Sequence, residues 1–335
     1  MNKNVIIIAE AGVNHNGDYN RAVEMIYAAK AAGADYVKFQ TAVPELVISS
    51  VAPKAEYQKE TTGNNESQLD MCRKIHLKLT DYKPLAEICQ QVGIGFMSTP
   101  FDLVSIDCLA ELGMDYWKIP SGEITNLPYL RKIASKGGKV ILSTGMSIPE
   151  EIDAAIAILE DGGIARCDIS LLHCNTQYPT PMSDVNLKAM AQLRTMTKGM
   201  VGYSDHTVGI EVPIAAVALG AQIIEKHFTL DKTLPGPDHR ASLDPAELTA
   251  MVKAIRNIEN ALGDGSKRVS DSERPNIKVA RKSIIAARDI KAGEILTEEN
   301  LTIKRPGNGL SPMLWDSVIG TPAIRDFKAD HLIEI

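Results

Sequence analysis

The chain carries a recurring set of polar side chains whose chemistry suits an active site. Each lies at or just after the end of a short apolar run, and together they comprise Glu10, Lys38, Gln40, Lys118, Ser121, Glu123, Ser143, Thr176, Tyr178, Ser204, His206 and His227. Burying such a group costs free energy unless the group is paired, so stability alone does not explain a set this consistent. The pattern predicts that these side chains meet at one site.

Two lysines and three serines in this set are typical of an anion-binding site. Lysine ammonium groups attract phosphate and carboxylate as point charges, and serine hydroxyls donate hydrogen bonds. The residues concerned are Lys38, Lys118, Ser121, Ser143 and Ser204. We predict that they bind a small anionic substrate.

The lysines allow two other interpretations. In the first they are structural and form buried ion pairs with Glu10 or Glu123, a role that a lysine can combine with substrate binding. In the second, one of them forms a Schiff base with the substrate, as in an aldolase. Lys38 lies close to Gln40 and lacks the apolar setting that lowers a lysine pKa, which counts against a Schiff base.

His206 and His227 follow two consecutive apolar runs and predict a metal site. Imidazole binds first-row divalent metals, and two histidines leave coordination positions open for a substrate. His15 has no such partner, and its role is open between a turn hydrogen bond and substrate contact. Asp238 is either a turn residue or a carboxylate that orients substrate and water at the metal.

The elements that must position these residues alternate between short apolar runs and segments with helical spacing. The apolar runs cover residues 4–9, 35–39, 94–97, 116–119, 139–142, 168–172, 200–203 and 222–225. Eight strand–helix units with nearly continuous apolar strands predict a parallel (β/α)₈ TIM barrel, whose active site lies at the carboxyl ends of the strands. A doubly wound open sheet is the alternative, but no G-x-G-x-x-G turn follows the first run.

The barrel is expected to occupy residues 1–263. Asp244 and Pro245 have the form of a helix start, and Gly263 follows the last apolar position of that helix. The polar stretch 264–278 is expected to be a linker, and residues 279–335 a small β-rich domain. So short a domain has a small core, so we expect it to pack on a partner surface.

Composition excludes several classes of partner. The chain has 335 residues and a net charge of −6, which argues against nucleic acid and anionic membranes. No stretch has the length of a signal or a membrane span, and the five cysteines form no C-x-x-C pair. We expect a cytoplasmic protein with reduced thiols.

Several motifs resemble those of the bacterial sialic acid synthases, and they extend over essentially the whole chain. They cover residues 10–17, 38–41, 98–102, 118–123, 143–146, 203–207, 225–228, 235–238 and 304–309. The resemblance implies that phosphoenolpyruvate condenses with the open-chain aldehyde of an N-acylated amino sugar. The products would be a nine-carbon 2-keto acid and phosphate, released by C–O cleavage.

The resemblance also implies roles for individual residues. His206 and His227 would hold a divalent metal, typically Mn²⁺, with Mg²⁺ and Co²⁺ as alternatives. Phosphoenolpyruvate would lie among the lysines and serines described above, with Thr176 nearby. Contacts with the sugar or with water at the metal would come from Glu10, Gln40, Tyr178 and Asp238, and Glu123 is a candidate acid or base. Together with Lys38, the residues Glu10, Glu123 and Asp238 form the predicted catalytic set.

The C-terminal part resembles the antifreeze-like (SAF) domain of these synthases. The resemblance implies a homodimer in which this domain caps the barrel of the other subunit, and Arg305 reaches the acyl group of the sugar. Asn64 is a further candidate for sugar contact.

Three sugar substrates fit the resemblance. N-acetylmannosamine, which gives N-acetylneuraminate, is the first choice. The alternatives are 2,4-diacetamido-2,4,6-trideoxymannose, which gives N,N'-diacetyllegionaminate, and the precursor of pseudaminate. A non-enzymatic alternative is a carbohydrate- or ice-binding protein on an inactive barrel, and the intact polar set argues against it.

Overall fold

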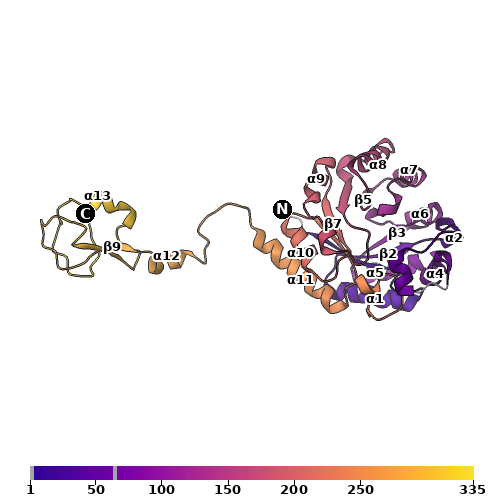
Figure 1. The fold of residues 1–335 in the computed structure, drawn as a ribbon, viewed down its shortest axis with the longest axis horizontal. Coiled ribbons are helices and arrows are strands. Elements are labelled where there is room, and N and C mark those ends of the chain that lie inside the picture. The colour runs from indigo at the N-terminus through magenta and orange to yellow at the C-terminus, as the bar shows by residue number, and fades with distance from the viewer. Residues whose placement is uncertain (1–3, 63–65) are drawn as a thin grey trace. The chain divides into compact units, whose positions relative to one another are not determined.

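The computed structural model describes residues 4–62 and 66–335 (Figure 1). The chain divides into two compact units, Met1–Gly263 and Asp264–Ile335. None of the described helices is long and apolar enough to cross a membrane.

The first unit contains an eight-stranded parallel sheet whose ends meet. The strands are β1 (Ile6–Gly12), β2 (Tyr36–Thr41), β3 (Gly95–Pro100), β4 (Tyr116–Ile119), β5 (Lys139–Ser143), β6 (Ile169–His173), β7 (Val201–Asp205) and β8 (Ile223–His227). Their order is β3-β2-β1-β8-β7-β6-β5-β4, and β3 lies beside β4, so the sheet curves into a nearly closed barrel. The predicted TIM barrel is confirmed, and a doubly wound open sheet is wrong.

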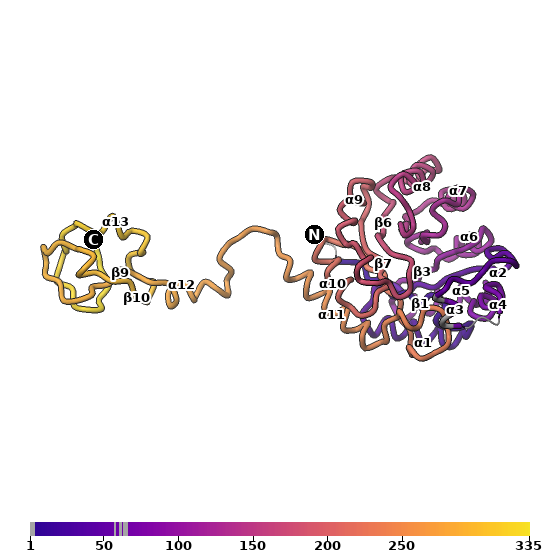
Figure 2. The backbone as a smooth tube through the Cα atoms, viewed as in Figure 1, coloured from indigo at the N-terminus to yellow at the C-terminus, as the bar shows by residue number. Residues whose placement is uncertain are grey.

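Helices surround this barrel (Figure 2). They are α1 (Tyr19–Ala32), α2 (Pro44–Val47), α3 (Glu56–Thr62), α4 (Gln68–Ile75), α5 (Tyr82–Val92), α6 (Leu103–Ala110), α7 (Leu127–Lys136), α8 (Pro149–Asp161), α9 (Ala189–Met196), α10 (Glu211–Ala218) and α11 (Pro245–Leu262). The last of them, α11, packs against α1 and α10 and so completes the ring. The Asp244 carboxylate caps α11 and Gly263 follows its end, as the sequence predicts.

Alternation along the strands separates two sets of side chains. In β8, Ile224 belongs to the large core between strands and helices, whereas Ile223 packs inside the barrel. The interior apolar layer comprises Ile8, Met97, Ile141, Leu172 and Ile223. Inward positions nearer the carboxyl ends of the strands are polar instead, so the residues above this layer can face a shared pocket.

All the strands except β4 run further toward their carboxyl ends than the sequence predicts. For example, β1 continues to Gly12 and β8 to His227, beyond the ends predicted at residues 9 and 225. Polar residues at these positions suggest loops when a single strand is considered alone. Inside a barrel they are buried against polar residues of neighbouring strands, and the backbone ladder continues: Glu10 pairs with Lys38 on one side and with His227 on the other.

Lys226 and Asp205 point away from the barrel interior and form a fully buried ion pair. The Lys226 ammonium lies 2.6 Å from Asp205 Oδ2, and both side chains have no exposed surface. Thr207 donates further hydrogen bonds to the Asp205 carboxylate from its backbone N–H and its hydroxyl, both at 3.0 Å. The pair fastens the ends of β7 and β8 together.

Replacing Asp205 with alanine is expected to lower the free energy of unfolding by about 3–5 kcal/mol, because it leaves the Lys226 charge buried without a partner. Urea denaturation measures this loss. Asp107→Ala is the matched control, since Asp107 is about half exposed and pairs with two lysines at the surface. Equal losses in the two variants would contradict the structural role of the Asp205 pair.

The second unit has its own small core. Its elements are α12 (Arg274–Ala280), β9 (Ser283–Ala286), β10 (Leu301–Lys304) and α13 (Trp315–Val318). β9 and β10 pair antiparallel, and isolated bridges join Ile290 to Phe327 and Ile295 to Pro322. The predicted small β-rich domain is confirmed.

Helix α12 begins inside the stretch predicted as a linker. Residues 264–278 show no apolar period because α12 buries none of its side chains, so nothing in their pattern distinguishes this helix from a loop. Pro275 occupies its first turn, where proline costs no hydrogen bond.

Candidate active site

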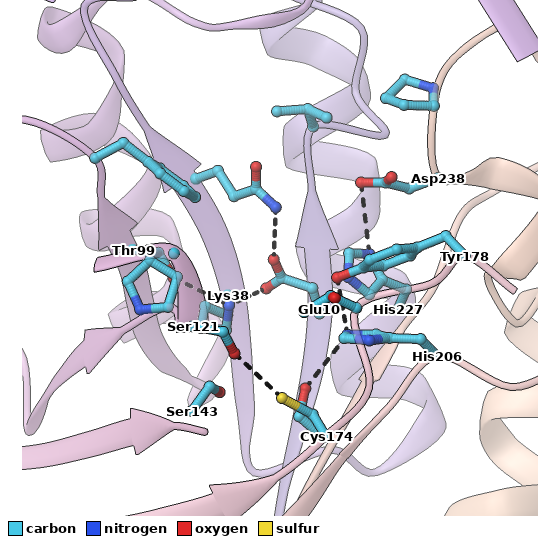
Figure 3. A pocket seen from close by; sticks show the side chains of 18 of the residues that line it. Glu10, Lys38, Thr99, Ser121, Ser143, Cys174, Tyr178, His206, His227 and Asp238 are labelled. Carbon is cyan, nitrogen blue, oxygen red and sulfur yellow. Dashed lines mark hydrogen bonds and ion pairs between the residues drawn. The ribbon is translucent and has the colours of Figure 1, made fainter. Parts of the chain in front are cut away.

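A pocket of about 280 Å³ opens at the carboxyl ends of the barrel strands (Figure 3). Most residues predicted from the sequence line it: Glu10, Lys38, Gln40, Lys118, Ser121, Ser143, Thr176, Tyr178, Ser204, His206, His227 and Asp238. Alternation along the strands explains the gathering of those on strands, which share the inward face above the interior apolar layer. Ser121, Thr176, Tyr178, His206 and Asp238 lie on the segments that follow the strands at the same end of the barrel.

Four buried charged residues form the floor of the pocket. Lys38 Nζ lies 2.6 Å from Glu10 Oε2 and 3.6 Å from Glu225 Oε2. Lys118 Nζ lies 3.8 Å from Glu225 Oε1. The four side chains are at most 5% exposed. The lysines therefore form buried ion pairs, but the second carboxylate is Glu225, not Glu123.

Burial and neighbouring charges set the protonation of this charged floor. Burial raises the pKa of Glu10 to about 6, against the opposing effect of Lys38. Burial is also the largest influence on Lys38, but the charges of Glu10 and Glu225 outweigh it and raise the lysine's pKa. In Lys118 burial prevails and lowers the pKa. The two lysine ammonium groups of the floor favour an anionic ligand.

Hydroxyl groups extend the floor into an anion cradle. The Lys118 ammonium donates a hydrogen bond of 2.7 Å to Ser143 Oγ, and the Lys38 ammonium donates one of 3.1 Å to Thr99 Oγ1. These hydroxyls hold both ammonium groups at the pocket surface.

Gly145 provides space beside this cradle. Its backbone N–H donates to Ser121 Oγ at 2.9 Å. A Cβ atom at this position would lie 2.8 Å from Thr176 Cγ2 and 2.9 Å from Ser121 Oγ. A larger residue would therefore displace two side chains that line the pocket.

Two histidines lie next to each other in the pocket wall. The His206 ring donates from Nδ1 to the backbone carbonyl of Asn175, so Nε2 carries a lone pair, which accepts a hydrogen bond of 2.9 Å from the Tyr178 hydroxyl. The His227 ring lies 5.5 Å from the His206 ring, and its Nδ1 lies 3.9 Å from Asp238 Oδ2. Within the described residues, this buried Nδ1 has no hydrogen-bond partner.

Burial keeps both imidazoles neutral. It lowers the pKa of His206 to about 4 and that of His227 well below its usual value, with the His206 ring adding to the second shift. Burial, together with the charge of Glu10, raises the pKa of Asp238 to about 7. Neutral imidazoles beside a carboxylate fit a divalent metal of the first transition row. In residues 4–62 and 66–335, no group of three or more metal-binding side chains gathers.

The structure does not assign three of the predicted residues to the pocket. Glu123 is not among the described residues that line the pocket, and its carboxylate accepts a hydrogen bond of 2.6 Å from Asn126. Asn64 lies outside the described residues. Arg305 belongs to the second unit, where its Nε donates to the carbonyl of Ala280 at 3.2 Å. Their predicted roles stay predictions.

His15 makes a turn hydrogen bond. Its Nδ1 accepts from the backbone N–H of Gly17 at 3.1 Å, and its ring packs on Phe39 without exposed surface. It is not among the described residues that line the pocket. Of the two roles considered, the turn hydrogen bond is the one observed.

Sequence reasoning assigned no role to several residues of the pocket wall, and three of them contact the predicted residues. Glu225 bridges both lysines and also accepts a hydrogen bond of 2.9 Å from Ser204. Thr99 holds Lys38, and Cys174 Sγ lies 3.3 Å from Ser121 Oγ. The spacing of Glu225 could have identified it as a pocket residue. It lies two residues before His227 on one strand and so faces the same side.

Comparison with known proteins assigns both parts of the chain to families. The NeuB family model matches residues 25–267, and the SAF domain model matches residues 281–334. The N,N'-diacetyllegionaminic acid synthase of Campylobacter jejuni is 54% identical over 99% of this chain and 99% of its own length. The enzyme of the same name from Legionella pneumophila is 47% identical, over 94% of this chain and 89% of its own.

A solved structure shares the fold as well as the sequence similarity. The N-acetylneuraminic acid synthetase of Leptospira borgpetersenii is 37% identical, with a TM-score of 0.71. The match covers 82% of this chain and 91% of that one.

Proposed function

The chain belongs to the NeuB family and ends in a SAF domain, and from that premise we propose that it makes N,N'-diacetyllegionaminate. The family consists of phosphoenolpyruvate-dependent nonulosonate synthases, so the protein is a transferase. Family membership also favours the enzyme over a carbohydrate-binding protein on an inactive barrel.

The choice of sugar is supported by one comparison above all. The two relatives named as legionaminic acid synthases are 54% and 47% identical, against 37% for the neuraminic acid synthetase. The sequence alone led us to put N-acetylmannosamine first, and these identities favour the alternative. The proposed acceptor is 2,4-diacetamido-2,4,6-trideoxymannose in its open aldehyde form.

The charged floor and its cradle suit phosphoenolpyruvate. Its phosphate and carboxylate would be bound by Lys38 and Lys118 together with the hydroxyls of Ser121, Ser143 and Ser204. Burial in a site of low dielectric strengthens these interactions compared with water. Fixing both anionic groups would orient the nucleophilic C3 carbon toward the acceptor.

The histidine pair suits the aldehyde. Enzymes of this family depend on a metal, and a divalent ion on His206 and His227, with Mn²⁺ as our proposal, would supply Lewis acidity to the aldehyde oxygen. Gln40, Tyr178 and Asp238 line the same pocket and would orient the sugar.

The carboxylates of the pocket suit the remaining steps. C–C bond formation leaves positive character at C2, which the negative charge of Glu225 would stabilise. Glu10, in contact with Lys38, would accept the proton of the water that adds at C2. Collapse of the tetrahedral species then breaks the C–O bond and releases phosphate.

The proposed dimer rests on the second unit. Its surface carries apolar side chains that include Met313, 91% exposed, and Ile324, 59% exposed. Such exposure suits a domain that packs on a partner subunit. Arg305 would reach the sugar from that position, and Asn64 would contact the sugar from its own barrel.

Phosphate release with each sugar tests the proposal. We expect kcat/KM for the diacetamido-trideoxymannose to exceed that for N-acetylmannosamine by at least tenfold in the presence of Mn²⁺, and EDTA to abolish both. Higher kcat/KM with N-acetylmannosamine would contradict the proposed substrate.

A further inference from the structure

Helix α4 presents an apolar face to the pocket and a charged face to solvent. Met71, Cys72 and Ile75 line the pocket, at spacings that place them on one side of the helix. The opposite side carries Asp70, Arg73 and Lys74, which form ion pairs at the surface. The helix is amphipathic, and its apolar side faces the pocket.

These apolar side chains are buried without being part of a hydrophobic core. Met71 is 2% exposed, and Cys72 and Ile75 are each 9% exposed. Within residues 4–62 and 66–335, none of the three belongs to the hydrophobic clusters of either unit. The Thr62 hydroxyl lies 3.5 Å from the Met71 sulfur and helps to fix it. Among the described residues, the apolar face of α4 therefore lies outside these clusters and lines the pocket.

Helix α4 lies beside the loop that carries Asp238. A Cβ atom on Gly17 would lie 2.5 Å from the Lys74 carbonyl oxygen, and Asn16 Nδ2 donates to the Pro235 carbonyl at 2.8 Å, so α4 and this loop meet at one turn. Asp238 lies beside His227 and lines the pocket together with Met71, Cys72 and Ile75. Figure 3 shows Glu10 between Lys38 and Asp238, so Asp238 lies on the side of Glu10 away from Lys38.

We propose that Met71 and Ile75 form an apolar subsite for the C6 methyl group of the acceptor sugar and select for 6-deoxy sugars. The inference rests on the proposed function, because it takes the aldehyde to lie at His206 and His227. C6 is the end of the open chain opposite the aldehyde, and its methyl group would meet the apolar side chains that α4 contributes to the pocket.

The chemistry of the two side chains explains the selection. A methyl group gains from contact with the thioether of Met71 and the aliphatic side chain of Ile75. A hydroxymethyl group in the same place would lose its hydrogen bonds to water and find no partner on either side chain. An apolar pocket rejects an added hydroxyl by up to about a hundredfold in kcat/KM.

Two sugars that differ only at C6 test the subsite. They are 2,4-diacetamido-2,4,6-trideoxymannose and its counterpart with a 6-hydroxyl, each supplied with phosphoenolpyruvate and Mn²⁺. The wild-type enzyme is expected to prefer the 6-deoxy sugar by about tenfold to a hundredfold in kcat/KM.

Met71→Gln introduces polar atoms with little change of volume, and Ile75→Thr introduces a hydroxyl with the loss of one methyl group. Each is expected to reduce the preference by about tenfold while the KM for phosphoenolpyruvate stays unchanged. Lys74→Gln, on the charged side of the same helix, is the control and should keep the wild-type preference. A preference that both variants retain would overturn the subsite.

The wild-type measurement separates this inference from the proposed function. Turnover of both diacetamido sugars at equal kcat/KM would overturn the subsite and leave the proposed function standing. Turnover of N-acetylmannosamine with neither diacetamido sugar would overturn both. If the two variants fail to fold, which thermal melting reports, the wild-type ratio alone decides.

Discussion

Replacing His206 or His227 with alanine is expected to lower kcat for phosphate release by about a thousandfold or more, which is at least about 4 kcal/mol of barrier. Both imidazoles are buried and neutral, and their lone pairs face the pocket. Either substitution leaves a single imidazole, and one imidazole does not hold a metal firmly where the aldehyde binds.

The control for the histidine variants is His331→Ala. His331 is an exposed residue of the second unit, so its loss should leave turnover unchanged. Metal content, measured on the dialysed protein, should fall in both pocket variants and stay at the wild-type level in the control. Near-normal turnover in either pocket variant would contradict the assignment of the pair.

Replacing Lys118 with methionine is expected to reduce kcat/KM for phosphoenolpyruvate by a hundredfold to several thousandfold, which is about 3–5 kcal/mol. Lys118 is 97% buried and holds Ser143, so its charge acts on an anion without screening by water. Glu225 keeps Lys38 and Ser204 as partners, so the fold should tolerate the change.

Lys139→Met is the matched control for this substitution. Lys139 begins β5, next to the strand of Lys118, and lies at the opposite end of the barrel. Its ammonium contacts only the Tyr116 ring in the described part of the chain, at 5.8 Å. Similar losses of kcat/KM in both variants would show that general electrostatics, not the cradle, binds the substrate.

The barrel could be predicted from sequence because its strands are buried on both sides and are therefore apolar for most of their length. The polar pocket residues stood out against these runs, as Lys38 and Lys118 do within β2 and β4. For the same reason, the strands β1 and β8 were predicted to end too early. Polar residues inside a barrel resemble loop residues when their partners on other strands are unknown.

Other features could not be predicted, because they depend on contacts between residues far apart in the sequence. The role of Glu225 follows from its distances to two lysines on other strands. The apolar face of α4 has the spacing of an ordinary core helix, and only the structure separates Met71 and Ile75 from the core. Glu123 follows a strand like the pocket residues, yet it turns toward Asn126 at the start of α7.

A competition between the two acceptor sugars tests the central claim most directly. The enzyme, loaded with Mn²⁺, receives a limiting amount of phosphoenolpyruvate and equal concentrations of N-acetylmannosamine and 2,4-diacetamido-2,4,6-trideoxymannose. Mass spectrometry then measures the two nine-carbon products in the same sample. We predict that N,N'-diacetyllegionaminate exceeds N-acetylneuraminate by at least tenfold. An excess of N-acetylneuraminate, or release of phosphate without either product, would contradict the account.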